Sequence, residues 1–261
     1  MSARACPVHV AFNHDRRVRL TVCTIAVALQ GIRGAPVALA ANREERYDRP
    51  ASPPAVVTTN PAVFAPTDTV AGGTWIGINE FGLAAAIANR PSPRTGDRSR
   101  GWIVRDALAC SDVAAATDAI RERVREHTYA GFMLVLIDNE QASTITWNGE
   151  WMHRPLESGV HVITNNGVNG ETAKSATIRS RLMSLDGATT EAWTNRTQTV
   201  LADHASGACE HGQDAGTRSS SIIACDEDGT VHYQFADGPP CVTSYETYLD
   251  GPIGTNPGPK L

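Results

Sequence analysis

Residues 23–46 read CTIAVALQGIRGAPVALAANREER and contain two apolar runs of strand length. The runs cover residues 23–29 and 36–41, and Gly31 and Gly34 lie between them. Short apolar runs of this kind, separated by glycine, are typical of a β-hairpin. The first run begins at a cysteine, and the second leads directly into a polar Asn-Arg-Glu-Glu sequence.

A second hairpin is predicted further along the chain. Residues 74–79 and 83–89 are strand-like, and Gly82 in the connecting turn suits a positive φ. This hairpin brings Asn89 to the end of a strand.

Residues 50–66 contain five prolines. Proline lacks the backbone N–H that a central strand or a helix requires. We therefore expect this passage to run as a surface loop that could cover a site as a lid.

The rest of the chain alternates blocks of strands with pairs of helices. The run 131–138 is continuously apolar, which indicates a strand covered on both faces. The other expected elements are a helix from a cap at Asp97 or Ser99 to about 110, a second from a cap at Ser111 or Asp112, helices near 174–185 and 189–204, and strands near 142–148, 150–154, 160–164, 219–225 and 230–236. This order predicts an α+β fold, a four-layer αββα sandwich of two antiparallel sheets.

Composition limits the classes of function. The 261 residues have a net charge of −5 and a pI near 5.9, which argues against a nucleic-acid-binding surface. No apolar stretch is long enough for membrane insertion. We expect one domain at 23–250, a leader or misassigned start at 1–22, a flexible tail at 251–261, and a small molecule or protein as partner. The oligomeric state stays open.

The first 22 residues contain four arginines and no apolar run of the kind that secretory signals have. If they are absent from the working protein, through a start at Val22 or through self-cleavage, Cys23 is the N-terminal residue. Its thiol and free α-amine would then supply a nucleophile and a general base. The alternative is a disordered tail ahead of an ordinary strand cysteine.

Six cysteines are scattered along the chain without C-x-x-C pairs, which is typical of reduced thiols in a cytoplasmic protein. Cys209-Glu210-His211 has two residues of metal-binding type, but the sequence around it lacks the further partners of a four-ligand site. We therefore expect neither a metal site nor a cofactor.

Several motifs resemble the NRDE protein family, the transport and Golgi organisation protein two family. They are Cys23-Thr24, Asn42-Arg43-Glu44-Glu45, Gly72-Gly73-Thr74-Trp75-Ile76-Gly77-Ile78-Asn79, Gly82-Leu83, Asn89-Arg90, Ser99-Arg100-Gly101, Thr164-Asn165 and Gly216-Thr217-Arg218-Ser219-Ser220. Glu44 replaces the aspartate of the family's name motif.

The layout is more distantly similar to N-terminal-nucleophile (Ntn) hydrolases of the choloylglycine hydrolase and acid ceramidase type. That resemblance implies catalytic roles for Cys23, Arg43, Glu44, Asn89, Asn165 and Arg218, and substrate-binding roles for Asn42, Glu45, Trp75 and Asn166. In those hydrolases an acid lies three residues after the first arginine, whereas this chain has Arg46 there.

These residue types are suited to acyl transfer through a thioester. Arginines near the sulfur, Arg43 and Arg218, would favour the thiolate and would pair with Glu44 or Glu45 in the empty site. The Asn89 side chain and a backbone N–H near Asn165 could hold a developing oxyanion.

Two functions remain open at this point. The first is an N-terminal cysteine amidohydrolase acting on a small acyl-amide. The second, which the family resemblance implies, is a non-enzymatic protein that binds or carries haem or lipid on a hydrolase scaffold, with His153 or His161 as possible haem ligands.

Overall fold

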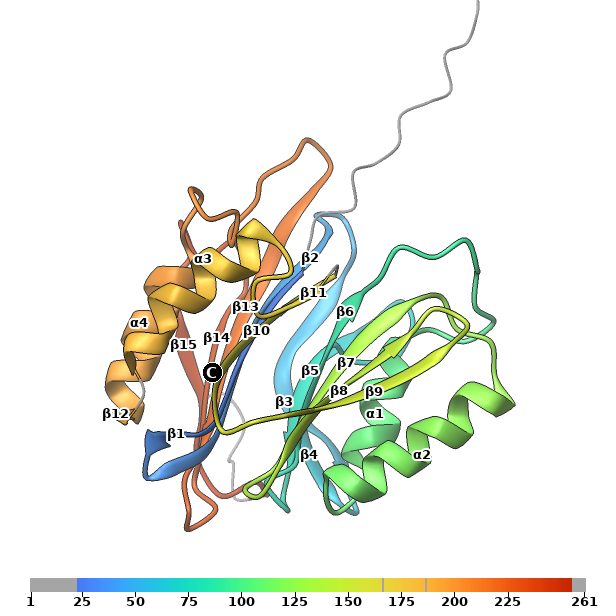
Figure 1. The fold of residues 1–261 in the computed structure, drawn as a ribbon, viewed down its shortest axis with the longest axis horizontal. Helices are drawn as coiled ribbons and strands as arrows, with labels where there is room; N and C mark the ends of the chain where they lie inside the picture. The colour runs from blue at the N-terminus through green and yellow to red at the C-terminus, as the bar shows by residue number, and fades with distance from the viewer. Residues whose placement is uncertain (1–22, 166, 186, 255–261) are drawn as a thin grey trace, which may run out of the picture.

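The computed structural model describes residues 23–165, 167–185 and 187–254. In this part of the chain two antiparallel sheets are stacked face to face, and a pair of helices covers the outer face of each (Figure 1). The expected αββα sandwich is confirmed. The expected leader lies outside the described residues.

The first sheet has the strand order β11-β10-β1-β2-β13-β14-β15, with the short β12 running parallel beside β1. Its strands are β1 (Thr24–Arg33), β2 (Ala35–Arg46), β10 (Gly159–Thr164), β11 (Gly167–Val168), β12 (Ala188–Thr189), β13 (Ala215–Cys225), β14 (Val231–Ala236) and β15 (Glu246–Gly251). Helices α3 (Ala173–Leu182) and α4 (Thr190–Leu201) pack on its outer face.

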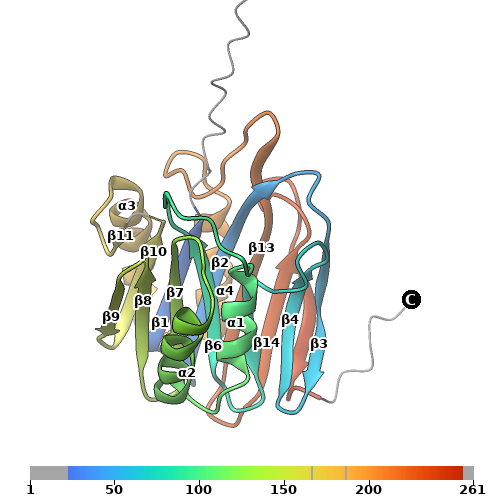
Figure 2. The same cartoon turned by 90° about the vertical axis from the view of Figure 1, so that its right-hand side faces the viewer.

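The second sheet has the order β3-β4-β5-β6-β7-β8-β9. Its strands are β3 (Ala51–Thr59), β4 (Ala62–Asp68), β5 (Ile76–Asn79), β6 (Ala84–Asn89), β7 (Phe132–Ile137), β8 (Ala142–Trp147) and β9 (Trp151–Leu156). Helices α1 (Gly101–Leu108) and α2 (Val113–Glu126) lie across its outer face (Figure 2).

The central strand β1 is buried on both faces, and its side chains alternate between two cores. Ile25, Val27 and Leu29 belong to the core that includes the space between the sheets. Ala26 and Ala28 pack in the core under α3 and α4, where small side chains let the helices approach closely. Because side chains alternate with a period of two, Cys23 belongs with the inter-sheet group.

The proline-rich passage does not form the expected loop. Residues 51–68 form the hairpin of β3 and β4 at the edge of the second sheet. Pro53 and Pro54 lie on the edge strand, where the pairing register shifts between Ser52 and Ala55. An edge strand and an irregular register both tolerate a missing N–H, which is why the prediction of a lid was wrong.

Helix starts were predicted with mixed success. The Asp112 side chain accepts a hydrogen bond from the backbone N–H of Ala115 and caps α2, as expected. At the start of α1 Arg100 makes no side-chain cap, but the Ser99 hydroxyl oxygen accepts a hydrogen bond from the Gly101 N–H at 3.4 Å, so of the two expected caps Ser99 contacts the helix start and Asp97 does not. The structure also adds β15 at a sheet edge beyond the strand expected to be the last one.

Gly73 packs directly against the start of α1. A Cβ built on Gly73 would come within 2.5 Å of the backbone carbon of Gly101, and the Gly101 carbonyl accepts a hydrogen bond from the Thr74 N–H at 3.1 Å. We expect Gly73→Ala to lower the free energy of unfolding by about 1–3 kcal/mol, because backbone must move to admit the methyl group. Urea unfolding measures this. Thr69→Ala, at an exposed position in the same loop, is the control, and an equal effect of both changes would contradict the prediction.

Candidate active site

Cys23 lies in a row of polar residues that crosses four strands. Continuing the registers of β1 with its two neighbours to the first described residue sets Cys23 between Arg43 on β2 and Asn165 at the end of β10. Ser219 on β13 lies opposite Arg43. Residues opposite one another in antiparallel strands have side chains on the same face. The fold therefore gathers residues from distant segments around one thiol.

The Cys23 thiol is buried, and burial raises its pKa above the ordinary value. The Glu44 carboxyl raises the pKa further, whereas hydrogen bonds from the backbone of Glu44 and of Asn89 oppose the shift. A thiol in this state is mostly protonated at neutral pH and needs a base before it can act as a nucleophile.

Arg43 is the buried cation of the site. Its guanidinium lies 4.1 Å from the ring centroid of Trp75, and its Nη2 lies 3.1 Å from Asp68 Oδ2 and 3.9 Å from Glu45 Oε2. Nη1 is buried and has no hydrogen-bond partner among the described residues. Burial lowers the Arg43 pKa, and Glu45 and Asp68 oppose this effect. The Nη2 side of the guanidinium is therefore held by two carboxylates, and Nη1 can donate a hydrogen bond to a ligand oxygen.

Glu44 and Asn42 belong to the opposite face of β2. Glu44 Oε1 accepts a hydrogen bond from the Thr217 hydroxyl at 2.7 Å. The Asn42 side-chain amide donates to the backbone carbonyls of Leu201 and Ala208, at 2.9 and 2.7 Å. Of the two acids expected to pair with an arginine, Glu45 does so with Arg43 and Glu44 does not, because alternation along the strand places Glu45 on the arginine's face.

Burial raises the pKa of Glu44 from 4.5 to about 8. The folded protein thus keeps a proton that the unfolded chain loses, and the free energy of unfolding should fall as pH rises from 4.5 to about 8. We expect Glu44→Gln, which stays neutral, to remove much of this fall. Urea unfolding at pH values across that window tests this, and equal pH dependence in both proteins would contradict it.

The cavity beside Cys23 has a volume of about 140 Å³. Of the residues expected at the site it is lined by Cys23, Arg43, Glu45, Trp75 and Asn89, and also by Asn42 and Glu44, whose side-chain hydrogen bonds are made on the other face of β2. Asn89 is the last residue of β6 and Trp75 precedes β5, so the second sheet supplies the opposite wall. The structure thus brings together most of the residues named from the sequence.

Three residues expected at the site lie elsewhere or cannot be placed. Asn165 is buried next to the strand row but does not line the cavity. Arg218 lies in a β-bulge of β13 and its Nη1 donates to Asp237 Oδ1 at 3.0 Å, so it pairs with neither Glu44 nor Glu45. Asn166 lies outside the described residues.

Three further residues that line the cavity were not predicted from the sequence: Asp68, Arg49 and Arg100. Arg49 Nε lies 2.7 Å from Asp68 Oδ2, which makes this carboxylate the shared partner of two arginines. Arg100 lines the cavity, and its Nη1 donates to the Gly131 carbonyl at 2.9 Å. Only Arg100 had a sequence signal, as a member of the Ser-Arg-Gly motif.

The histidines considered for haem lie away from this cavity. Both ring nitrogens of His161 are engaged, Nε2 with the Glu157 carbonyl at 2.7 Å and Nδ1 with the Asn169 side chain at 2.6 Å. His153 lies on the edge strand β9 and is exposed. Neither position lends support to haem ligation.

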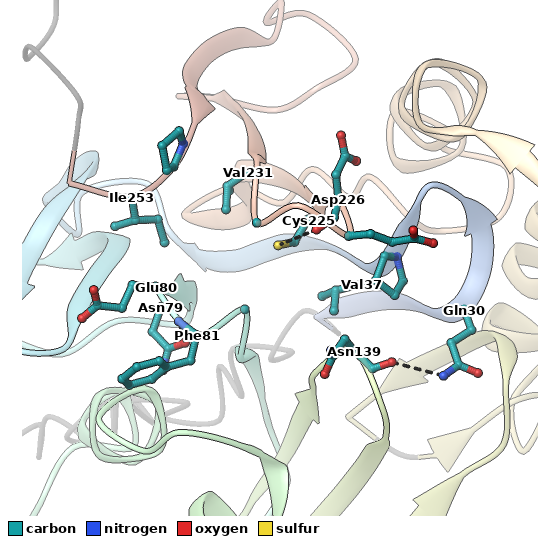
Figure 3. A pocket seen from close by; sticks show the side chains of 15 residues that line it. Gln30, Val37, Asn79, Glu80, Phe81, Asn139, Cys225, Asp226, Val231 and Ile253 are labelled. Atoms are coloured by element: carbon teal, nitrogen blue, oxygen red, sulfur yellow. Dashed lines mark hydrogen bonds between the residues drawn. The ribbon is translucent and has the colours of Figure 1, made fainter.

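A larger cavity, with a volume of about 650 Å³, lies at the other end of the strands (Figure 3). Its walls include Val37, Phe81 and Cys225, and Val37 pairs with Cys225 where β2 begins and β13 ends. Burial raises the pKa of Cys225 to about 11, and its Sγ faces the backbone oxygen of Asp226 at 3.7 Å. The smaller cavity, with its buried cation and acids, is the better candidate for chemistry despite its size.

Among the described residues there is no helix long and apolar enough to cross a membrane.

Solved structures share this fold at low sequence identity. Penicillin V acylase from Agrobacterium tumefaciens superposes with a TM-score of 0.55 at 14% identity, over 82% of this chain and 83% of that one. A mutant conjugated bile acid hydrolase from Clostridium perfringens gives 0.53 at 12% identity, over 89% and 98%. An N-acylethanolamine-hydrolyzing acid amidase orthologue from Caenorhabditis elegans gives 0.51 at 15% identity, over 77% and 92%. These three proteins therefore share the two-sheet fold of this chain, which is the Ntn hydrolase-like fold expected from the sequence.

Sequence relatives are more specific. The Bos taurus protein named Transport and Golgi organization protein 2 homolog is 28% identical over 232 residues, which is 75% of this chain and 84% of that protein. The Mus musculus homolog is 33% identical over 105 residues, 38% of each chain. Residues 22–206 match the family described as Transport and Golgi organisation 2, and the chain belongs to that family.

Proposed function

We propose that the protein is an N-terminal cysteine amidohydrolase that cleaves a small acyl-amide through a thioester at Cys23. The observation that carries this proposal is the position of the Cys23 thiol, which lies next to a buried arginine whose Nη1 has no partner among the described residues. A buried donor of this kind is costly unless a ligand oxygen satisfies it.

The steps balance without a cofactor. The free α-amine of Cys23 takes the thiol proton, and the sulfur attacks the amide carbonyl carbon. The C–N bond breaks, and the departing amine takes the proton back from the α-ammonium. Water then hydrolyses the thioester, which releases the acid and restores the thiol.

The substrate class follows from the size and polarity of the cavity. A volume of about 140 Å³ admits the reacting amide and a short part of the acyl group, so the rest of the substrate extends outside. Arg43 Nη1 would bind an oxygen of the acyl side, and Trp75 would face its apolar part. The proteins of this fold named above are an acylase, a bile acid hydrolase and an acid amidase, which agrees with this class.

The raised Cys23 pKa makes the proposal testable. A Cys23 whose nitrogen is in a peptide bond has no adjacent amine and should react slowly with iodoacetamide at neutral pH. Protein purified from its own host should begin at Cys23 by intact mass and N-terminal sequencing, and should alkylate there rapidly. Incubation with a panel of acyl-amides should then add one acyl group at Cys23.

The free-amine mechanism would be excluded if every molecule keeps residues 1–22 and the Cys23 thiol is alkylated slowly. The high thiol pKa would then favour the second function, a binding or trafficking protein for a small molecule or lipid that uses the same cavity without chemistry.

A further inference from the structure

The loops at one end of the first sheet bring two cysteines and two histidines together. They are His204, Cys209 and His211, in the segment between α4 and β13, and Cys241, between β14 and β15. One potential ligand atom from each residue lies within 4.8 Å of all the others. No metal was expected here from the sequence, because the Cys-Glu-His segment lacked further ligands, but the fold supplies them.

Two of the distances are close to those around a tetrahedral ion. Cys209 Sγ lies 3.8 Å from His211 Nε2, and that nitrogen lies 3.2 Å from Cys241 Sγ. With Zn–S near 2.3 Å and Zn–N near 2.0–2.1 Å, tetrahedral ligands are separated by about 3.3–3.8 Å. Small side-chain rotations therefore suffice to close the site around an ion.

Hydrogen bonding also prepares one of the histidines. His204 Nδ1 lies 3.0 Å from the Cys209 carbonyl oxygen. Because a carbonyl only accepts, the proton is on Nδ1 and the lone pair is on Nε2. Metal-binding histidines are commonly held by a carbonyl in this way.

We infer that His204, Cys209, His211 and Cys241 bind one structural Zn²⁺ ion. Four ligands leave no open position for a substrate, and two thiolates with two neutral imidazoles neutralise the ion's charge. The two thiol protons leave to solvent on binding. The ion would join two segments that contain neither helix nor strand for most of their length, 202–214 and 237–245.

The ion would also stabilise the backbone behind the candidate active site. Ala208, next to a ligand, accepts the hydrogen bond of Asn42. Glu210 lies between two ligands, its backbone N–H donates to Thr217 Oγ1 at 2.9 Å, and the same hydroxyl donates to Glu44. Zinc would thus help to position the Asn-Arg-Glu-Glu motif. The presence of the zinc site does not depend on the proposed hydrolysis.

The test is the metal content of the full chain, purified without an affinity tag or chelator. Elemental analysis should give one zinc per chain, and Cys209→Ser or Cys241→Ser should reduce this at least tenfold. Cys110→Ser, at a half-buried thiol elsewhere, should keep it. Titration of the zinc-free protein with Co²⁺ should produce thiolate charge-transfer and tetrahedral d–d bands, and zinc should raise the melting temperature.

Three results would overturn the inference. The first is wild-type protein that neither contains zinc nor develops the cobalt spectrum. The second is zinc that remains in both cysteine variants. The third is an intact mass lower by two hydrogens with a disulfide mapped between Cys209 and Cys241, which would make the cluster a redox pair. The main measurement is the metal content of the wild-type protein, so the test of zinc binding is still decisive if a variant fails to fold.

Discussion

Replacing Cys23 with serine should lower kcat/KM for acyl-amide hydrolysis on the order of 10³-fold or more and leave the fold intact. The hydroxyl is nearly the same size as the thiol, but it is a far weaker nucleophile at neutral pH, and the other site residues cannot replace the attacking atom. Steady-state hydrolysis of a substrate found in the acyl-amide panel gives the rate, and circular dichroism gives the fold.

Cys110→Ser is the matched control. Its thiol is half-buried, and it belongs to the turn between α1 and α2 rather than to the cavity. We expect this variant to keep its activity. Undiminished turnover in Cys23→Ser would exclude the thioester mechanism, whatever the state of the N-terminus.

The alternation of side chains along β1 and β2 made part of the site predictable from the sequence. Positions 23, 25 and 27 share one face of β1, and residues 39, 41, 43 and 45 share the corresponding face of β2. Counting in twos from the buried Leu39 assigns Arg43 and Glu45 to the face of Cys23, and Glu44 to the other. The family motif alone does not distinguish Glu44 from Glu45, whereas the strand period does.

Other parts of the site depend on pairings that local sequence does not encode. Asn165 joins the row of Cys23 only because β10 pairs with β1, more than a hundred residues earlier in the chain. The register shift between Thr217 and Ser219 inserts Arg218 as an extra residue, so no count along β13 predicts its direction.

The same limit explains the metal-ligand cluster and the proline-rich strands. Cys241 contacts His211 across two loops, and only the pairing of β13 with β14, and of β14 with β15, brings these loops together. Pro53 and Pro54 are compatible with a strand because β3 is the edge of its sheet, which depends on tertiary structure.

Arg43→Ala should have the largest effect on stability. Arg43 is 6% exposed, and its removal leaves Asp68, itself 14% exposed, with Arg49 as its remaining ion-pair partner. Breaking a buried pair on one side costs about 3–5 kcal/mol, and we expect a value of about 3 kcal/mol because Arg49 keeps part of the interaction. The urea unfolding midpoint measures this loss.

Two further variants separate the causes of this effect. Arg46→Ala removes a neighbouring arginine whose pair with Asp48 is exposed, and it should leave the midpoint unchanged within error. Arg43→Lys keeps the charge but loses the planar fork over Trp75, so it should recover part of the stability. If Arg43 Nη1 binds the substrate, Arg43→Lys should also lower kcat/KM under conditions where the variant is fully folded. A lysine ammonium cannot hold Asp68 and a ligand oxygen in the same two-sided geometry. Equal effects of Arg43→Ala and Arg46→Ala would show instead that the buried guanidinium contributes little to the fold.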